Sequence, residues 1–507
     1  MAGSLPSDVL IEVFHLLPRP ELYWDRYSLI DVAGVNKAWR TAALESASLW
    51  SCIRTEHRRD LLLLPLLLER SRTSSLDVRL DLFCNEYGNV SADSTPQERA
   101  EVVQALLPHA RRIQKLYIRH PTLEPTSEDT EAILHLVDVG LEFTILTEYT
   151  HERMGDDTAE SDTPLNFTGP NLLKLSVDGT RPRQWSTLLA ATLVELHIGS
   201  MGTPIDMDLL GTIFQQCGSL SSLELQQGFD EDHTPLSPGS QWRFTPPPSI
   251  RTLDLTMPMS EIIAVLGLFL SSPLLHSVTV CDDQGLTARV LGRKRPHPIL
   301  THMLRGLDSL IAFEVYTDQD ILLRDAAGRA RRFQVTAEDD PCYETGALWA
   351  FLVARYAAHR TVRTVLGTTS AWSWLVRALD RHQPDPPAES GVELQIVMDD
   401  YGSFQQSCAS GDTPTLYLAA LSTLTLMPPT HAAGRAQCSV EAVLHMLSMV
   451  RSERRGVVVC IGELMLKGVP PHVVAYQTLA DGLASVGPTG MWSPCAHCAA
   501  RAAEIRE

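Results

Sequence analysis

The chain of 507 residues has little of what marks secreted or membrane proteins. Its first residues lack the basic region and long apolar run of a secretory signal. Its most apolar stretch, residues 61–68, contains Pro65 and is far too short to cross a bilayer. Ten cysteines are scattered without a framework of regular spacings, which is typical of a reducing compartment. These absences predict a protein of the cytoplasm, the nucleus or both.

Positive charge is also scarce, because 42 Lys and Arg residues face 61 Asp and Glu residues, giving a formal net charge of −19. Nucleic acids and anionic membrane surfaces attract proteins through basic patches. We therefore expect neither a nucleic-acid partner nor a membrane partner. The 44% hydrophobic and 20% charged content is that of an ordinary globular chain and excludes general disorder.

Motifs that carry catalytic chemistry are missing as well. The sequence has no GxxxxGK[ST] phosphate loop, no HExxH and no GxSxG. The nearest approach to a metal motif is a weak candidate formed by Cys495, His497 and Cys498. A structural zinc needs four ligands, and a zinc deaminase would also need a His-x-Glu pair, which none of the 17 histidines provides. We expect no enzyme activity, no metal and no cofactor.

What the sequence does have is a pair of apolar stripes near its beginning. Hydrophobic residues recur at helical spacing from Val9 to Leu17, and again from Leu29 to Trp39. A helical unit this short cannot bury both stripes by itself. Either the downstream chain or a partner protein must cover them, and spacing alone does not decide between the two.

The order of anchors resembles an F-box. Leu5-Pro6 opens the segment, a helix with Leu10 and Phe14 follows, then a V-x-K-x-W-R helix, and Leu49-Trp50 closes it. Two departures are a long connection over residues 18–28 and Asn36 where many F-boxes carry Cys. The resemblance implies a helical docking domain over residues 1–55 that binds a Skp-type adaptor and through it a cullin–RING ubiquitin ligase. The implied adaptor-binding residues are Leu5, Pro6, Leu10, Val13, Phe14, Leu17, Val35 and Trp39.

Later blocks extend the resemblance to F-box proteins of mushroom-forming fungi. These blocks lie at residues 49–53, 68–71 and 76–80, and more weakly at 169–175 and 217–223. The resemblance fades after about residue 315.

The chain beyond residue 55 predicts parallel strands with outer helices. Residues 76–82 alternate apolar and polar side chains, a capping box with proline starts a helix at Thr95-Pro96, and a second strand follows at 113–118. A strand–helix–strand order favours an α/β fold with a parallel sheet.

The pattern apolar-x-x-apolar-x-apolar then recurs along the chain. Its occurrences after 113–118 are residues 172–177, 193–198, 220–225, 250–255, 275–280, 310–315 and 421–426. Separations of 21, 27, 30 and 25 residues between the first five of these are typical of leucine-rich repeats. The asparagine that usually follows the strand is absent, so another group must satisfy each turn. We expect an irregular leucine-rich-repeat-like solenoid over residues 56–507, a flattened and uneven horseshoe that is regular to about 318. The alternative is a non-repeating α/β domain.

Less regular elements are expected later in the chain. They are a β-hairpin at 321–324 and 333–336, helices at 349–356 and 439–451, and strands at 392–398 and 456–461.

Two functions fit these patterns. In the first, the chain is the substrate-recognition subunit of a Skp–cullin–F-box ligase, and the repeat face binds a target protein, with a preference for a basic segment because five of its ten expected contact residues are acidic. In the second, it is a non-catalytic scaffold whose N-terminal helices only cap the solenoid. Exposed Leu10 and Phe14 would favour the first and buried ones the second. The expected target-binding residues are Tyr117, Arg119, Asp178, Glu195, His197, Glu224, Asp254, Thr256, Glu314 and Tyr316.

Overall fold

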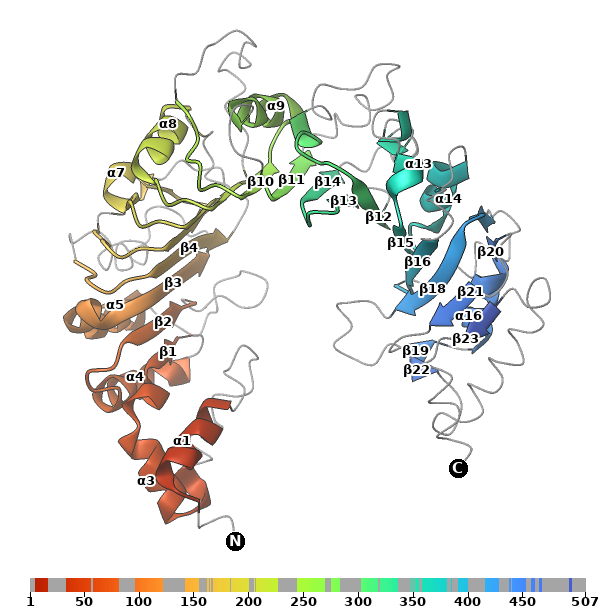
Figure 1. Cartoon of the computed structure of the whole chain (residues 1–507). Coiled ribbons are helices and arrows are strands. Elements are labelled where there is room, and N and C mark those ends of the chain that lie inside the picture. The colour runs from red at the N-terminus through yellow and green to blue at the C-terminus, as the bar shows by residue number, and fades with distance from the viewer. Residues whose placement is uncertain are drawn as a thin grey trace. The chain divides into compact units, whose positions relative to one another are not determined.

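A computed structural model gives the fold of the chain as a mixed α/β protein with helices first and mostly parallel strands after them (Figure 1). It divides into two compact units, Met1–Thr234 with Ser240–Ile250, and Pro235–Gly239 with Arg251–Glu507. The structure describes residues 5–16, 33–55, 58–81, 96–121, 142–154, 162–163, 165, 167–182, 184–199, 205, 207–226, 244–269, 275–282, 302–317, 320–335, 348–349, 352–354, 358–380, 384, 391–399, 415–427, 437–438, 440–452, 457–460, 465–466 and 492–494. The expected boundary at residue 55 rests on a motif rather than on compactness, and it stays a prediction.

The first unit begins with a helical pair, α1 (Ser7–Leu16) and α3 (Lys37–Glu45), followed by a 3₁₀ turn, η2 (Ala47–Trp50). Asn36, the departure from the F-box pattern, is the N-cap of α3. Its side-chain oxygen accepts a hydrogen bond from the Trp39 amide at 3.0 Å. Asparagine therefore starts the helix by satisfying one of the free N–H groups of its first turn.

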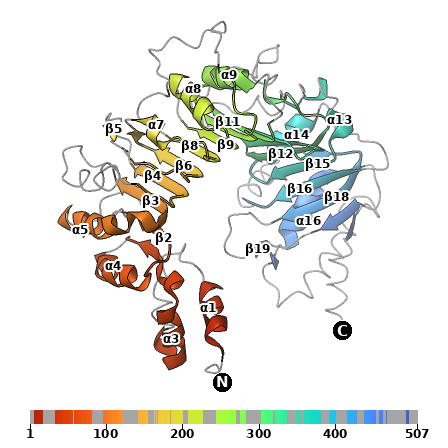
Figure 2. The same cartoon turned by 60° about the vertical axis from the view of Figure 1, so that its left-hand side comes forward.

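In the described part of the first unit, seven parallel strands follow, in sequence order across the sheet. Figures 1 and 2 show its helices α4, α5, α7 and α8 on one side of the strands. The strands are β1 (Cys52–Arg54), β2 (Leu76–Leu80), β3 (Ile113–Pro121), β4 (Glu148–Met154), β6 (Lys174–Asp178), β8 (Glu195–Ile198) and β9 (Ser222–Leu225). The helical segments are α4 (Arg58–Arg70), α5 (Pro96–Leu106), η3 (Leu107–Arg112), α7 (Trp185–Leu188) and α8 (Met207–Gln216), and β5 (Asp162–Thr163) pairs with β7 (Arg181–Pro182).

The apolar anchors of the repeating pattern form the core of this sheet. Leu172, Leu193 and Leu220 are fully buried, and each closes the same turn by donating its amide to the carbonyl three residues earlier, at 3.0 to 3.1 Å. The next two anchors on each strand are also buried, while the residues between them face the other side. The pattern that defined the repeat in the sequence therefore defines a repeated local geometry.

Short polar side chains take the place of the missing asparagine ladder. They precede the first anchor of a strand and bond to backbone carbonyls of the preceding turn. Asn171 Nδ2 donates to Thr144 O at 2.8 Å, Thr192 Oγ1 to Leu172 O at 2.9 Å, and Ser249 Oγ to Leu220 O at 2.6 Å. These bonds satisfy carbonyls that would otherwise be left without a partner.

As far as the structure describes it, the main sheet of the second unit has ten strands, in the spatial order β10, β11, β14, β13, β12, β15, β16, β18, β21 and β23. Neighbours are parallel except where β13 lies antiparallel between β14 and β12. The strands are β10 (Thr252–Thr256), β11 (Ser277–Asp282), β12 (Leu310–Thr317), β13 (Asp320–Asp325), β14 (Ala330–Val335), β15 (Thr364–Thr368), β16 (Val392–Val397), β18 (Leu421–Met427), β21 (Val457–Cys460) and β23 (Trp492–Pro494).

Shorter elements complete the second unit. Its helices are α9 (Met259–Leu268), α13 (Ala358–Thr361), α14 (Trp372–Asp380) and α16 (Val440–Ser448). Two small parallel pairs are β17 (Leu416–Tyr417) with β20 (Val450–Arg451), and β19 (Gln437–Cys438) with β22 (Met465–Leu466). Among the described residues, no helix has the length and apolar character needed to cross a membrane.

The expected hairpin is confirmed as β13 and β14, and it is inserted between β11 and β12. Its turn contains Gly328 at φ +77°, a conformation that glycine adopts without strain. Because the insertion adds one strand in each direction, β12 stays parallel to the rest of the sheet.

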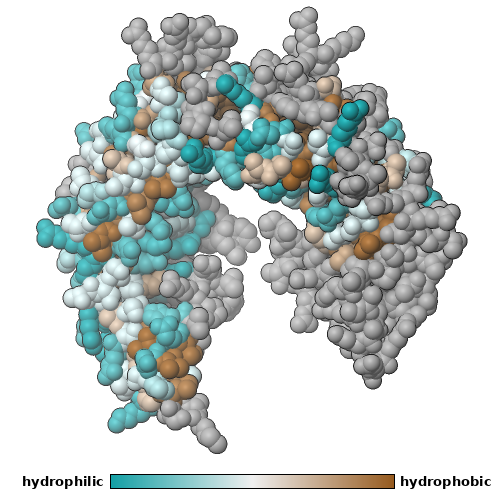
Figure 3. All heavy atoms as spheres, in the orientation of Figure 1, coloured by the Kyte–Doolittle hydropathy of each residue, from teal (hydrophilic) through white to brown (hydrophobic). Residues whose placement is uncertain are grey.

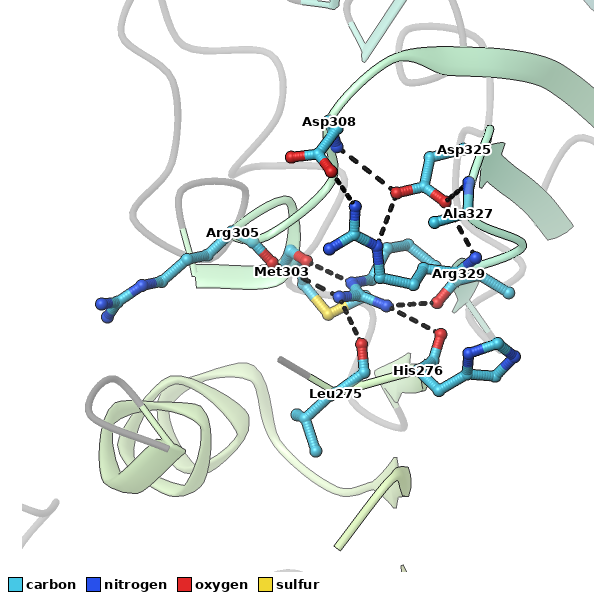
Figure 4. Close-up of polar contacts among 10 residues, drawn as sticks. Leu275, His276, Met303, Arg305, Asp308, Asp325, Ala327 and Arg329 are labelled. Carbon is cyan, nitrogen blue, oxygen red and sulfur yellow. Dashed lines mark hydrogen bonds and ion pairs between the residues drawn. The ribbon is translucent and has the colours of Figure 1, made fainter. Parts of the chain in front are cut away.

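A buried arginine holds the base of this hairpin in place (Figure 4). Arg331 of β14 is buried and is paired in register with Val278 of the neighbouring strand β11. Its guanidinium donates to main-chain carbonyls of Met303 at 2.7 Å and Leu275 at 3.0 Å, and also to those of His276, Arg305 and Ala330. Burial, with the nearby charge of Arg329, lowers the pKa of Arg331 to about 10. The side chain thus stays cationic and supplies donors to turns that end inside the core.

The hairpin turn has its own ion pair. Arg329 Nε lies 2.7 Å from Asp325 Oδ2, and the amides of Ala327 and Arg329 each donate to Asp325 Oδ1 at 2.9 Å. Arg329 also bonds to Asp308 (Figure 4). The carboxylate therefore satisfies the donors of a turn that would be costly to bury without partners.

Every strand expected from the repeat pattern is present, with small shifts at the ends. One helix was predicted too long. α16 ends at Ser448, and Val450 and Arg451 belong to strand β20, because Val450 pairs with Leu416. Of the helix expected at 349–356, the structure describes residues 349 and 352–354 as helical.

Candidate protein-interaction surfaces

The N-terminal helices bury one side of their apolar stripe against each other. Leu10 and Phe14 of α1 form a cluster with Ala42 and Ala43 of α3, and the Phe14 ring lies 5.4 Å from the ring of Trp39. Trp50 Nε1 donates to Ala43 O at 2.7 Å, which ties η2 to α3. The pair is therefore a small core made from its own two helices.

The other side of α1 remains apolar and open to solvent. Leu5 is 45% exposed, Val9 40% and Val13 37%. Val9 and Val13 are one helical turn apart, and Leu5 stands one turn before Val9. We call these three residues the α1 patch. Val35 is 58% exposed just before α3, and Figure 3 shows hydrophobic side chains gathered on the surface of this helical region.

Leu10 and Phe14 are buried, and by the criterion set from the sequence their burial favours the capping function over adaptor docking. They are 1% and 4% exposed. The stripe is wider than the contact with α3, so its centre is buried within the pair and its edge forms the α1 patch. Of the other expected adaptor-binding residues, Pro6 is exposed, Trp39 is half-buried and Leu17 lies outside the described residues.

A second surface is the open face of the first unit's sheet, opposite the buried anchors. Six of the expected target-binding residues lie on it, and five of them are half-buried while Glu195 is exposed. The six are Tyr117, Arg119, Asp178, Glu195, His197 and Glu224. These six side chains share one face because side chains alternate along a strand, and their role in target binding stays a prediction.

The acidic residues of this face have basic or hydroxyl neighbours. Lys174 Nζ lies 3.1 Å from Glu195 Oε2, and His197 Nδ1 lies 2.9 Å from Glu224 Oε2. Tyr117 donates its hydroxyl to Glu152 at 2.6 Å. The face therefore carries charge of both signs, and counting acidic residues in the sequence overstated its negative character.

His197 and Tyr117 are two of the groups on this face whose pKa values are shifted. Burial alone would lower the pKa of His197, but the hydrogen bond with Glu224 and the charges of Glu224, Asp178 and Glu152 raise it above its usual 6.5. Burial, followed by the hydrogen bond to Glu152, raises the pKa of Tyr117 well above 10. The Tyr117 ring also has the Arg79 guanidinium 4.4 Å from its centre.

In the second unit, Asp254, Thr256 and Tyr316 are half-buried, but Glu314 is buried. Arg324 of the inserted strand lies 2.7 Å from Glu314, and the Tyr316 hydroxyl donates to the same carboxylate at 2.7 Å. Because the hairpin supplies both neighbours, Glu314 stabilises the sheet rather than offering a charge to a partner. Glu314 is therefore not on the exposed surface on which the sequence placed it.

Several polar residues of the open face were missed in the sequence. Arg79, Lys115, Glu148, Glu152 and Lys174 all lie there, since they alternate with buried anchors on β2, β3, β4 and β6. The signal was available for Arg79, Lys115, Glu148 and Lys174, because each stands one residue from an apolar anchor of its strand, whereas Glu152 lies between His151 and Arg153.

Within the part of the chain that the structure describes, no three His, Cys, Asp or Glu side chains are placed to share a metal ion. Cys495, His497 and Cys498 lie outside the described residues.

Comparison with known proteins identifies the N-terminal region. Residues 2–56 match the F-box-like family model. A search of the curated proteins gives no match. The chain is thus an α/β protein whose N-terminal helices form an F-box-like segment, and this segment indicates a role in protein interaction of the kind found in ubiquitin-ligase substrate recognition.

Proposed function

We propose that the chain is the substrate-recognition subunit of a Skp–cullin–F-box ubiquitin ligase and is not itself an enzyme. In this function the α1 patch docks a Skp-type adaptor, and the strand face binds the target. The observation that carries the proposal is an exposed row of aliphatic side chains in the F-box-like segment. When a partner covers exposed aliphatic side chains, the free energy of the complex falls by about 25 cal/mol for each Å² of apolar surface removed from water.

The rest of the chain is proposed to be a degenerate leucine-rich-repeat solenoid. Repeated turns before Leu172, Leu193 and Leu220, and strands that follow one another across the sheet, support this proposal. Such an array presents a continuous face to one target, as the units of a solenoid contact only their neighbours.

Co-expression with a Skp-type adaptor tests the docking role. We expect the unchanged chain to co-purify with the adaptor, and the double substitution Val9→Asp with Val13→Asp to abolish recovery. Leu62→Asp on α4 is the matched control, because Leu62 is 81% exposed outside the F-box-like segment. Equal recovery of all three proteins would contradict the proposal. Phe14→Asp is unsuitable, since a charge inside the buried cluster would unfold the helical pair.

A second function is favoured by the burial of Leu10 and Phe14, which is what a capping role would give. The chain would then be an interaction scaffold without ubiquitin chemistry, and its helices would close the end of the solenoid. In that case Val9→Asp with Val13→Asp would leave all binding unchanged, while removal of residues 1–46 would destabilise the sheet.

A further inference from the structure

We propose that the open face of the first unit binds an α-helical target segment whose charges alternate in sign at each turn. The proposal rests on the target-binding role proposed above and specifies the class of target.

The observation is a row of alternating charges across five neighbouring strands, which we call the charge ladder. The strand register places Asp77 opposite Lys115, Lys115 opposite Glu148, Glu148 opposite Lys174 and Lys174 opposite Glu195. Two of the steps are ion pairs, Lys115 with Glu148 at 2.5 Å and Lys174 with Glu195 at 3.1 Å. The sign of the charge thus reverses at every strand from β2 to β8.

The ladder is open to a partner. The side chains of its two ion pairs are 44%, 41%, 49% and 52% exposed for Lys115, Glu148, Lys174 and Glu195. Exposed ion pairs contribute little to folding, so their arrangement is not explained by stability. The chain has only five lysines, and two of them stand in equivalent positions of this row.

Spacing favours a helix as the occupant. Neighbouring strands lie about 4.8 Å apart, so the ladder reverses sign with that period. A helix lying across the strands presents one turn every 5.4 Å or so, a mismatch of roughly 0.6 Å per step. An extended segment presents same-side residues about 6.8 Å apart and loses register by roughly 2 Å per step. Over four steps only the helix stays close enough to pair its charges.

Such a helix would also be preorganised. Opposite charges three or four residues apart stabilise an isolated helix, so a segment with the matching pattern already favours the bound conformation. The next row of the face leaves room for a helix, because the small side chains of Thr150 and Ser176 lie between Tyr117 and His197 in the register.

The probes are two synthetic 25-residue helical peptides of identical composition. One alternates Lys and Glu at successive turns along one face, and the other groups its Lys in one half and its Glu in the other. Binding to the full chain is measured by fluorescence anisotropy at low and at physiological salt. We expect saturable binding of the alternating peptide that weakens with salt, and about 10-fold weaker binding of the grouped peptide, or about 1.4 kcal/mol.

The matched protein variant is Lys174→Glu with Glu195→Lys. It keeps the ion pair and the net charge but breaks the alternation, so affinity for the alternating peptide should fall about 10-fold. The exchange also places a second carboxylate opposite Glu148, so we expect a small loss of stability, and the unfolding midpoint is measured to show that the variant remains folded. Glu101→Lys, an exposed charge reversal on α5, should leave binding unchanged. Absence of saturable binding, or equal binding of both peptides or by the exchanged variant, would overturn the proposal. Co-purification with the adaptor is measured in a separate experiment. A negative result for peptide binding to the charge ladder can therefore be distinguished from a negative result for adaptor docking.

Discussion

The N-terminal helices and the sheet that follows them bury their apolar residues to different degrees. Leu175, Leu196 and Leu223 on neighbouring strands have at most 2% of their surface exposed, whereas Val9 and Val13 on α1 keep 40% and 37%. The sheet completes its own core, because each strand and helix covers the next. The helical pair leaves Val9 and Val13 of its stripe exposed, and this difference supports the docking role proposed for the pair.

The largest effect should come from Arg331, a buried polar side chain in the core of the second unit. Arg331→Met keeps the volume but removes the donors for five main-chain carbonyls. Buried carbonyls left without partners should cost about 3 kcal/mol or more. Urea unfolding checks this. A loss below about 0.5 kcal/mol, as at a surface site, would show that water replaces the guanidinium.

The next effect tests whether the sheet's aliphatic anchors stabilise it. Leu223→Ala should lower the free energy of unfolding by about 3 kcal/mol, because it leaves a cavity among fully buried neighbours. Leu173→Ala is the control, since Leu173 lies on the same sheet but is 44% exposed. Equal losses for the two variants would remove the contrast between the inside and outside of the strands.

Substitution of the α1 patch should have almost no effect on stability. Val9→Asp with Val13→Asp should change the unfolding free energy by no more than about 0.5 kcal/mol, as is usual for exposed positions. Circular dichroism during thermal unfolding checks this. A large loss would mean that the patch is covered by the chain itself, and the two regions would then be alike.

The smallest effect is a pH dependence on the open face. The pKa of His197 is raised in the folded chain, so its pair with Glu224 stabilises the fold fully below the usual 6.5. That contribution is lost as pH rises through the higher folded-state value. Compared with His197→Gln, the unchanged chain should gain at most about 1 kcal/mol at pH 5.5 and nothing at high pH. A gain that grows with pH would contradict the assigned pair.

Much of the fold was predictable because it follows from the regular spacing of apolar residues along the sequence. The repeated anchors located the strands, the turn residues located the hairpin of β13 and β14, and Leu5 to Trp50 identified the F-box-like segment. The α1 patch was harder to predict. Val9, Leu10, Val13 and Phe14 are equally apolar in the sequence, and only the position of α3 decides which of them are buried.

The pairing of charged side chains on the strand face was also not predictable from the sequence alone. From the sequence we expected Glu314 to be exposed, but Arg324, which lies ten residues later on the inserted strand β13, forms an ion pair with it. Lys174 and Glu195 lie on different strands, and only the register of β6 with β8 makes them a pair. Pairing across strands depends on register, which apolar periodicity does not specify for the polar face.

The most direct test of the account is the affinity of the purified chain for a Skp-type adaptor, measured by calorimetry beside the unfolding midpoint of each variant. We predict that Val9→Asp with Val13→Asp weakens binding about 30-fold or more, as expected for central contact residues, while Leu62→Asp and the unfolding midpoints stay unchanged. Unaltered affinity of the double variant, or no affinity in the unchanged chain, would contradict the docking role of the α1 patch.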